Sequence, residues 1–346
     1  MARDHPPLLL ATHSMAMGGA PGGPPDGVYR LEPGGEPALA GLTGQGGLLS
    51  PVVVDADDAR RWYAGTRAGG VWRGGDAGAT WREVNDGLVY KEVWSLAQHP
   101  ATGALYAGTG PPAVFTSADR GGTWRICQHL MTLPSRRAWE FPGPPFHAHV
   151  KHLGLAAADP GLVLGAVEEG GVIRSRDGGR TWAVSNDGVE FDCHAVAVMP
   201  DDPAVVLATA GTGVYRSDDG GATFTASHDG IAKRYMTPLW THPDRPGLLL
   251  AGGSQLPPPG WRRPQGAAAA VYRSKDHGRT WERLGAGLPD PFVPAPISIV
   301  GDRDDPDAVY LGLSDGSVWA SRDAGERFQD VARGLPMVTG ITVIRR

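Results

Sequence analysis

The chain has 346 residues, with 51 glycines, 31 prolines, 11 tryptophans and a net charge of −5. This composition is typical of many short strands joined by tight turns, and the tryptophans exclude a disordered chain. The negative charge, without any basic run, excludes a dedicated nucleic-acid binder, and no apolar run is long enough to span a membrane. Two cysteines exclude a disulfide scaffold, and no signal peptide is recognisable, so we expect a cytoplasmic protein.

The first predicted elements are a strand over residues 8–12 and a second strand at residues 28–30. Pro33 follows where every later unit of the chain carries an aspartate, so this segment is a degenerate first copy of a repeat. This copy lacks an inner strand. The last apolar stretch, residues 340–344, supplies a strand without a unit of its own.

An eight-residue pattern then recurs six times, and Ser-Arg-Asp-Gly-Gly-Arg-Thr-Trp at 175–182 represents it. Its aspartate can accept backbone N–H bonds inside a turn, and its glycine supplies a positive φ. Its final aromatic residue re-enters a strand, so the pattern predicts a β-hairpin. The six copies lie at residues 74–81, 117–124, 175–182, 217–224, 274–281 and 321–328.

This string resembles the Asp-box, or BNR, repeat of sialidase-like β-propellers, which belong to the WD40/YVTN/BNR-like superfamily. The copies extend over nearly the whole chain. The resemblance implies that these aspartates are structural and lie away from any active site. Function is therefore expected in residues added to the repeat.

Each unit also contains two strands upstream of the hairpin, which makes four strands in about 43 residues, the size of a propeller blade. We therefore predict an all-β fold, a seven-bladed β-propeller that forms one domain over residues 1–346. Blade one would comprise about residues 8–42 together with the C-terminal strand at 338–346, and this pairing would close the ring.

Three insertions interrupt the period, at residues 13–27, 129–150 and 253–269. Because strand direction alternates within a blade, all three are expected on the face opposite the Asp-box hairpins, here called the upper face. Insertions confined to one face of a repeat protein indicate the binding face.

The second insertion holds a histidine-rich stretch, His147-Ala-His149, followed by His152. On an extended strand His147 and His149 would point to the same side. His152 is expected to begin the inner strand of blade four, at the mouth of the central channel.

Alignment of the inner strands places Glu92, Asp192 and Tyr235 at the matching entry position of blades three, five and six. His194 lies two residues after Asp192, on the same side of its strand. Other carboxyl groups expected on the upper face are those of Glu140, Glu168, Glu169 and Glu190.

These residues leave two interpretations open. One is a site for a single divalent ion (zinc, manganese, iron, nickel or copper), with ligands from His147, His149, His152 and His194 and a carboxylate from Glu92 or Asp192. The other is a set of structural or substrate-binding histidines with no cofactor. In the metal hypothesis the ion would polarise a ligand oxygen or activate a water.

The predicted catalytic residues are Glu92, Asp192 and Tyr235, with Tyr235 or a carboxylate transferring protons. The predicted substrate-binding residues lie in the second insertion: Arg136, Arg137, Trp139 and Glu140. Trp139 would stack on a ring-shaped ligand, or else pack within its long loop. The arginines would form a cationic patch, or else remain solvated.

The resemblance implies glycoside hydrolysis, which needs two carboxyl groups on either side of the scissile bond. The early Phe/Tyr-Arg-Ile-Pro motif of sialidases is missing, since the nearest string, Trp124-Arg-Ile-Cys127, follows an Asp box. We therefore expect a sialidase-like protein, not a typical exo-sialidase, that binds or acts on a small polar ligand such as a sugar. The alternative is a non-catalytic propeller that binds a protein partner.

Overall fold

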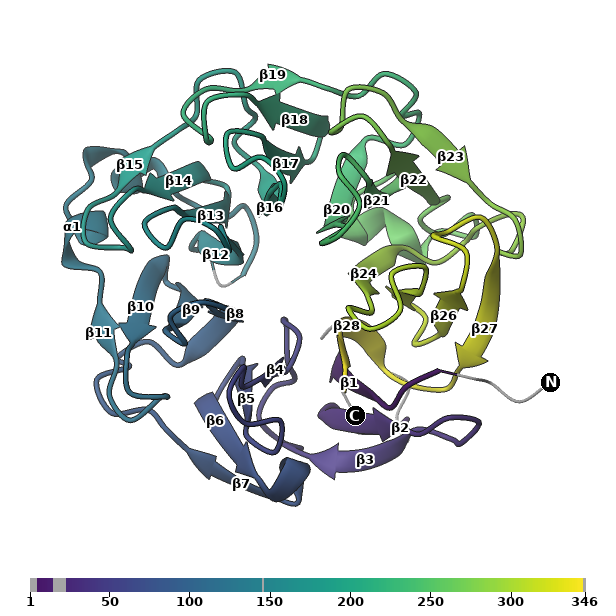
Figure 1. The fold of residues 1–346 in the computed structure, drawn as a ribbon, viewed down its shortest axis with the longest axis horizontal. Coiled ribbons are helices and arrows are strands. Elements are labelled where there is room, and N and C mark those ends of the chain that lie inside the picture. The colour runs from purple at the N-terminus through teal and green to yellow at the C-terminus, as the bar shows by residue number, and fades with distance from the viewer. Residues whose placement is uncertain (1–4, 15–22, 145, 345–346) are drawn as a thin grey trace.

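The computed structural model of the protein describes residues 5–14, 23–144 and 146–344. These residues form seven four-stranded antiparallel sheets around a central opening, which confirms the predicted seven-bladed β-propeller (Figure 1). Among the described residues, no helix is both long and apolar enough to cross a membrane.

Blades one to four contain, from the channel outwards, the following strands. They are β28 (Met337–Val343), β1 (Leu8–His13), β2 (Val28–Leu31) and β3 (Ala38–Gly41); β4 (Val53–Val54), β5 (Trp62–Thr66), β6 (Gly70–Gly75) and β7 (Thr80–Glu83); β8 (Glu92–Gln98), β9 (Leu105–Gly110), β10 (Ala113–Ser117) and β11 (Arg125–Ile126); and β12 (His149–Leu155), β13 (Val163–Glu168), β14 (Gly171–Ser175) and β15 (Ala183–Val184).

Blades five to seven follow the same order. The described residues also form four short helices, which lie in connections around the whole ring. The strands are β16 (Cys193–Val198), β17 (Val206–Ala210), β18 (Gly213–Ser217) and β19 (Thr225–Ala226); β20 (Tyr235–Thr241), β21 (Leu249–Ser254), β22 (Ala270–Ser274) and β23 (Glu282–Leu284); and β24 (Pro296–Gly301), β25 (Val309–Leu313), β26 (Val318–Ser321) and β27 (Phe328–Ala332). The helices are η1 (Asp76–Gly78), α1 (Gln128–Met131), η2 (Pro134–Ala138) and η3 (Pro258–Arg262).

The ring closes in blade one, where the last strand β28 pairs antiparallel with the first strand β1. Thr339 of β28 adds a side-chain contact, because its Oγ1 lies 3.1 Å from the carbonyl oxygen of Ala11 and 2.7 Å from that of Leu48. The predicted inner strand of the first blade is therefore supplied from the other end of the chain, and this pairing covers the inner edge of β1.

The hydrophobic core is divided into seven clusters, and each cluster lies between two neighbouring blades. Between blades four and five, for example, Val172 packs with Val196 and Val206. Between blades seven and one, Tyr310 packs with Leu8 and Leu10. Because every junction is filled in the same way, burial of apolar surface holds the ring together around its whole circumference.

The recurring aspartates fold the hairpin turns as the pattern predicts. In blade four, Asp177 Oδ1 accepts the backbone N–H of Thr181 at 2.8 Å, and Asp177 Oδ2 accepts the hydroxyl of Thr181 at 2.6 Å. The hydroxyl of Ser175 also donates to Asp177 and in turn accepts the N–H of Gly179. The turn thus satisfies its own polar groups without reaching the channel.

In blades three, five, six and seven, the aromatic residue that ends the motif also binds the backbone of the link that enters its blade. Phe224 donates its backbone N–H to the carbonyl of Asp187 at 2.9 Å, and Trp281 does the same to Asp229. The next residue in the first link, Gly188, has φ +78°, and a Cβ there would lie 1.8 Å from the Phe224 carbonyl oxygen. Only glycine fits this contact.

A β-bulge near the channel mouth is common to six of the seven inner strands. The extra residue is Trp94 in β8, Lys151 in β12 and His194 in β16, and equivalent shifts occur in β20, β24 and β28. A bulge breaks the strict alternation of a strand and redirects the side chain of the extra residue. In β8, β12 and β16 this extra residue lies two positions after the residue at the channel mouth.

Candidate site at the channel mouth

The bulges fix which residues are equivalent in neighbouring blades. The residue two positions before each bulge is Glu92 in β8 and Tyr235 in β20, and it is Asp192, immediately before β16, in blade five. In β12 the equivalent residue is His149, not His152 as the sequence alignment predicted, because β12 begins at His149 and its bulge lies at Lys151.

A network of polar contacts begins in blades two and three. Glu92 accepts from Arg67 Nε at 3.2 Å, from Trp94 Nε1 at 3.1 Å and from His147 Nε2 at 3.1 Å. Its carboxylate is only 17% exposed. Gly110 makes this packing feasible, because a Cβ at that position would lie 2.8 Å from His147 Nε2. Three nitrogen atoms from two blades and the long insertion thus surround the Glu92 carboxylate.

The network continues into blade four through ring stacking. The ring of Trp94 stacks on that of His149, with centroids 3.4 Å apart and an angle of 16° between the planes. His149 Nε2 donates to Glu168 Oε2 at 2.6 Å, and Lys151 Nζ donates to the same oxygen at 2.7 Å. Burial alone would raise the pKa of Glu168, but Lys151 and His149 hold it well below its usual range.

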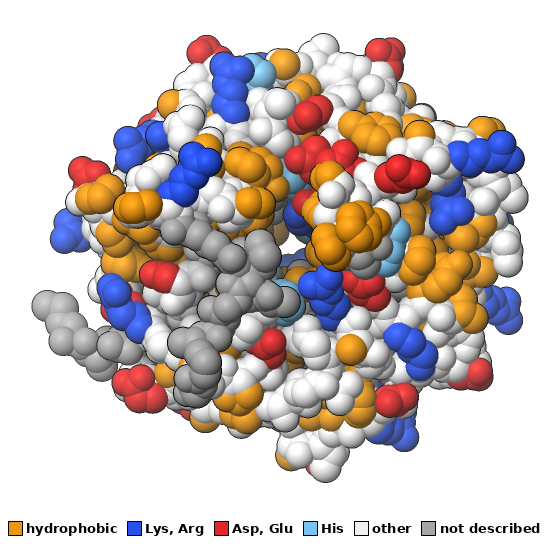
Figure 2. All heavy atoms as spheres, turned by 180° about the vertical axis from the view of Figure 1, so that it is seen from behind, with side chains coloured by type: hydrophobic (Ala, Val, Ile, Leu, Met, Phe, Trp, Pro, Cys, Tyr) orange, Lys and Arg blue, Asp and Glu red, His pale blue; other side chains and the backbone are white. Residues whose placement is uncertain are grey.

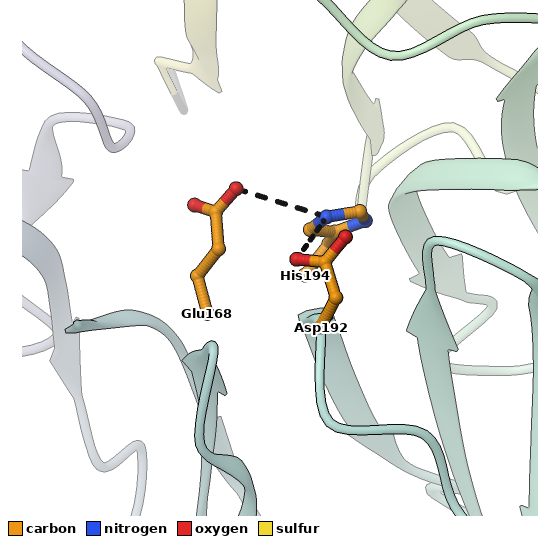
Figure 3. Close-up of side chains that lie close together, drawn as sticks. All are labelled: Glu168, Asp192 and His194. Carbon is orange, nitrogen blue, oxygen red and sulfur yellow. Dashed lines mark hydrogen bonds and ion pairs between the residues drawn. The ribbon is translucent and has the colours of Figure 1, made fainter. Parts of the chain in front are cut away.

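The network reaches blades five and six at His194. Its Nδ1 donates to the carbonyl oxygen of Met236 at 2.6 Å. Its Nε2 lies 3.1 Å from Asp192 Oδ1 and 3.8 Å from Glu168 Oε1, and Figure 3 shows the two carboxylates on the same side of the ring. The ring of Tyr235 packs beside it with centroids 4.7 Å apart. One imidazole therefore joins residues of three blades.

Two further groups tune the charge of this region. Glu169 follows Glu168 in the tight β13–β14 hairpin and has a left-handed φ of +61°, an uncommon conformation for glutamate. Burial and the neighbouring carboxylates of Asp192, Glu168 and Glu190 raise its pKa. Burial and the same carboxylates raise the pKa of Tyr235, so its hydroxyl stays protonated and can donate a hydrogen bond to a ligand.

The four histidines predicted to share an ion do not converge. His147 pairs with Glu92, and His149 pairs with Glu168. His152 accepts the backbone N–H of Val196, and burial lowers its pKa to about 4. Within the described part of the chain, the acidic and histidine ligand atoms that come together belong to Glu168, Asp192 and His194.

The predicted substrate-binding residues lie outside the network. Trp139 is only 4% exposed and packs against Leu130 and Val167, so it has no free face for stacking on a ligand. Arg136 donates to the carbonyl oxygen of Pro112 at 2.7 Å and lies over the Trp139 ring. Side chains of the long insertion thus hold it against the neighbouring strands. The other two predicted substrate-binding residues, Arg137 and Glu140, are exposed.

Lys151, Trp94 and Arg67 complete the network but were not among the predicted site residues, and Glu168 was expected only as one of several carboxyl groups on the upper face. Glu168 ends the second strand of its blade, at the hairpin position that Arg67 occupies in blade two, so the strand alignment could have identified Arg67 as well. Figure 2 shows acidic, basic and histidine side chains together around the central opening.

Comparison with known proteins supports the fold. No protein-family model matches the chain, and no curated protein matches it in sequence. Among solved structures it is similar to the GH74 xyloglucanase from Xanthomonas campestris, with a TM-score of 0.67 and 18% identity over 90% of this chain and 51% of that chain. It therefore spans about half the length of that enzyme.

Propellers whose titles name other roles are similar as well. A structure described as YCF48 bound to D1 peptide has a TM-score of 0.51 and 16% identity over 79% of each chain. The structure of U3-55K has a TM-score of 0.58 and 10% identity over 85% of this chain and 84% of that chain. At these identities the likeness shows the fold alone, and both glycosidases and non-catalytic propellers share it.

Proposed function

We propose that this protein is a sialidase-like Asp-box propeller that binds a small, oxygen-rich ligand such as a sugar at the channel mouth and acts on it. The observation that carries the proposal is the polar network across blades two to six. Its contacting pairs Glu92–His147, Glu168–Lys151 and Asp192–His194 are each partly or fully buried. They lie outside the hydrophobic clusters that fill the junctions between blades, and buried polar groups gathered at an opening are typical of functional sites.

Carboxyl groups in two protonation states support glycoside chemistry at this site. Glu169, with its raised pKa, is suited to donate a proton to a leaving oxygen, whereas Glu168, with its lowered pKa, stays ionised. Asp192 is 23% exposed, so it is the carboxylate that a ligand or a water can reach. Together they provide the acid and base that hydrolysis of a glycosidic bond requires.

The test is a binding and hydrolysis screen. We expect millimolar or tighter binding of one class of saccharide in calorimetry, and loss of turnover by at least about 100-fold in Asp192→Asn and Glu169→Gln. Asp304→Asn and Glu36→Gln change exposed carboxylates elsewhere and should leave binding and turnover unchanged. Binding that survives in both site variants would place the ligand away from the mouth.

One observation favours protein binding as a second candidate function. Phe146, beside His147, is 65% exposed with a left-handed φ of +63°, and Phe191, beside Asp192, is 37% exposed. Exposed aromatic side chains next to a polar site are typical of interfaces as well as of ligand stacking. Capture of a protein partner that Phe146→Ala abolishes, without any saccharide binding by the unmodified protein, would favour this function.

A further inference from the structure

Three ligand atoms from neighbouring blades meet at one point of the channel mouth. They are Glu168 Oε1, Asp192 Oδ1 and His194 Nε2, with Nε2 at 3.8 Å and 3.1 Å from the two oxygens (Figure 3). The ligand atoms that these residues offer lie within 4.8 Å of one another. Atoms that share one metal ion at about 2.1 Å lie about 3.0–3.4 Å apart at neighbouring coordination positions. Small side-chain movements would therefore suffice to bind an ion here.

His194 presents its second ring nitrogen to this point. The side chain is fully buried, and Nδ1 donates to the Met236 carbonyl oxygen at 2.6 Å, so Nε2 is the nitrogen that faces Glu168 and Asp192. An imidazole whose Nδ1 carries a proton can bind a metal ion through Nε2. A cation between Nε2 and the two carboxylates would be bound by all three groups.

The charges nearby favour binding of a divalent cation. Four carboxyl groups lie close together here, those of Glu168, Glu169, Glu190 and Asp192. Lys151, bound to Glu168 Oε2, compensates one of them. A dication would compensate two more, and it could bind Nε2 while Nδ1 keeps its bond to Met236.

The surroundings are those of a preorganised ligand set. His149 and Lys151 both bind Glu168 Oε2 and leave Oε1 directed at His194. The Met236 carbonyl fixes the orientation and tautomer of His194, and Tyr235 packs against its ring. Such outer contacts orient metal ligands and raise their basicity in known metal sites.

We propose that Glu168, Asp192 and His194 bind one divalent transition-metal ion, with a donor set of two carboxylates and one imidazole that suits manganese, iron(II), nickel or zinc. The remaining coordination positions face the channel mouth, where ligand oxygens or water would complete the sphere. This inference goes beyond the proposed function, because the ion would bind whether or not a saccharide does.

The test begins with chelator-treated, untagged full-length protein. Titration with manganese, iron(II), nickel and zinc, followed by calorimetry and elemental analysis, should give one bound ion per chain for at least one metal. Asp192→Asn should weaken that binding by on the order of 100-fold. Because His194 is buried, Asp192→Asn and Glu168→Gln are the primary variants, with circular dichroism to confirm that each is folded.

Two controls separate this site from other histidines. His277→Gln removes a histidine that pairs with Asp201, and His129→Gln removes an exposed histidine that accepts the backbone N–H of Trp182. Both lie outside the polar network and should bind metal as the unmodified protein does. Absence of stoichiometric binding for all four metals, or equal binding in folded Asp192→Asn and Glu168→Gln, would overturn the proposal. Saccharide binding is measured separately, with and without metal. A failure of the proposed function can therefore be distinguished from a failure of the metal proposal.

Discussion

At the scale of single residues, a carboxylate has a different role at each end of a blade. Asp177 closes a hairpin turn through hydrogen bonds from Ser175 and Thr181, and although burial opposes it these bonds lower its pKa to about 2. Glu168 at the channel mouth instead bonds to side chains of its own blade and lies close to a histidine of the next. The former stabilises the fold, and the latter gives the mouth its charge.

The lowered pKa of Asp177 predicts a stability effect in acid. An unfolded aspartate titrates near 3.9, so between about pH 4 and 2 the unfolded chain binds more protons than the folded one. The contribution of Asp177 is therefore complete above about pH 4 and is lost as the pH falls to about 2. Thermal melts should show a steeper acid decline for the unmodified protein than for Asp177→Asn.

The matched control for this prediction is Asp187→Asn in the link that follows the same blade. Asp187 is exposed and contributes its backbone carbonyl, not its carboxylate, to the structure. Its variant should retain the full acid dependence. Because the Asp177 turn lies near the surface, we expect a change of at most about 1 kcal/mol. Parallel pH curves for Asp177→Asn and the unmodified protein would contradict the assignment.

At the scale of elements, the contact that sets the start of an inner strand joins the hairpin of a blade to the link that enters the same blade. Phe224 binds the Asp187 carbonyl, and Gly188 follows directly, where any side chain would overlap the Phe224 carbonyl oxygen. The same close approach occurs at Gly87, Gly230 and Gly287. This contact fixes where each inner strand begins, and therefore where its entry residue lies at the mouth.

Gly188→Ala should lower the free energy of unfolding by about 3 kcal/mol or more, because it adds overlap to left-handed backbone strain. Gly334→Ala separates the cost of the overlap from the cost of the left-handed backbone conformation. Gly334 has φ +80° with no atom near its missing Cβ, so its alanine variant should cost only about 1–2 kcal/mol. Chemical denaturation measures both, and equal losses would show that overlap contributes nothing at Gly188.

The repeating elements could be predicted from the sequence, whereas the partners at the mouth could not. The motif spacing was enough to predict seven blades, and the unpaired strand at 340–344 was enough to predict ring closure. His152 was predicted at the entry position of β12, which His149 occupies three residues earlier, because the sequence showed neither where β12 begins nor the bulge at Lys151. Trp139 was predicted at the site, yet it packs against Leu130, because a loop's hydrophobic contacts leave no periodic pattern in the sequence.

At the scale of the whole molecule, stability depends on closing the ring. β28 joins β1 by backbone pairing, and the Thr339 hydroxyl reaches the carbonyls of Ala11 and Leu48, which lie in different parts of the N-terminal region. The apolar cluster between blades seven and one completes the junction. These contacts connect residues more than 280 positions apart, so no blade junction remains open.

Thr339→Val keeps the shape of the side chain but removes its hydrogen bonds at this junction. Two buried carbonyls then lose a donor, so the free energy of unfolding should fall by about 1–3 kcal/mol while unfolding remains one transition. Thr132→Val removes an exposed hydroxyl bond and should change stability by less than about 0.5 kcal/mol. Equal stability of the two variants would show that the Thr339 contacts do not strengthen closure.

The repeated bulge has a consequence for how such rings diverge. In β8, β12 and β16 the entry residue and the bulge residue, such as Asp192 and His194, lie near the channel and outside the apolar clusters between blades. Substitution at these paired positions can alter what the mouth recognises while the blade junctions keep their packing. In these blades recognition and folding depend on separate residues, so chains with one architecture can acquire different ligands through a few changeable positions.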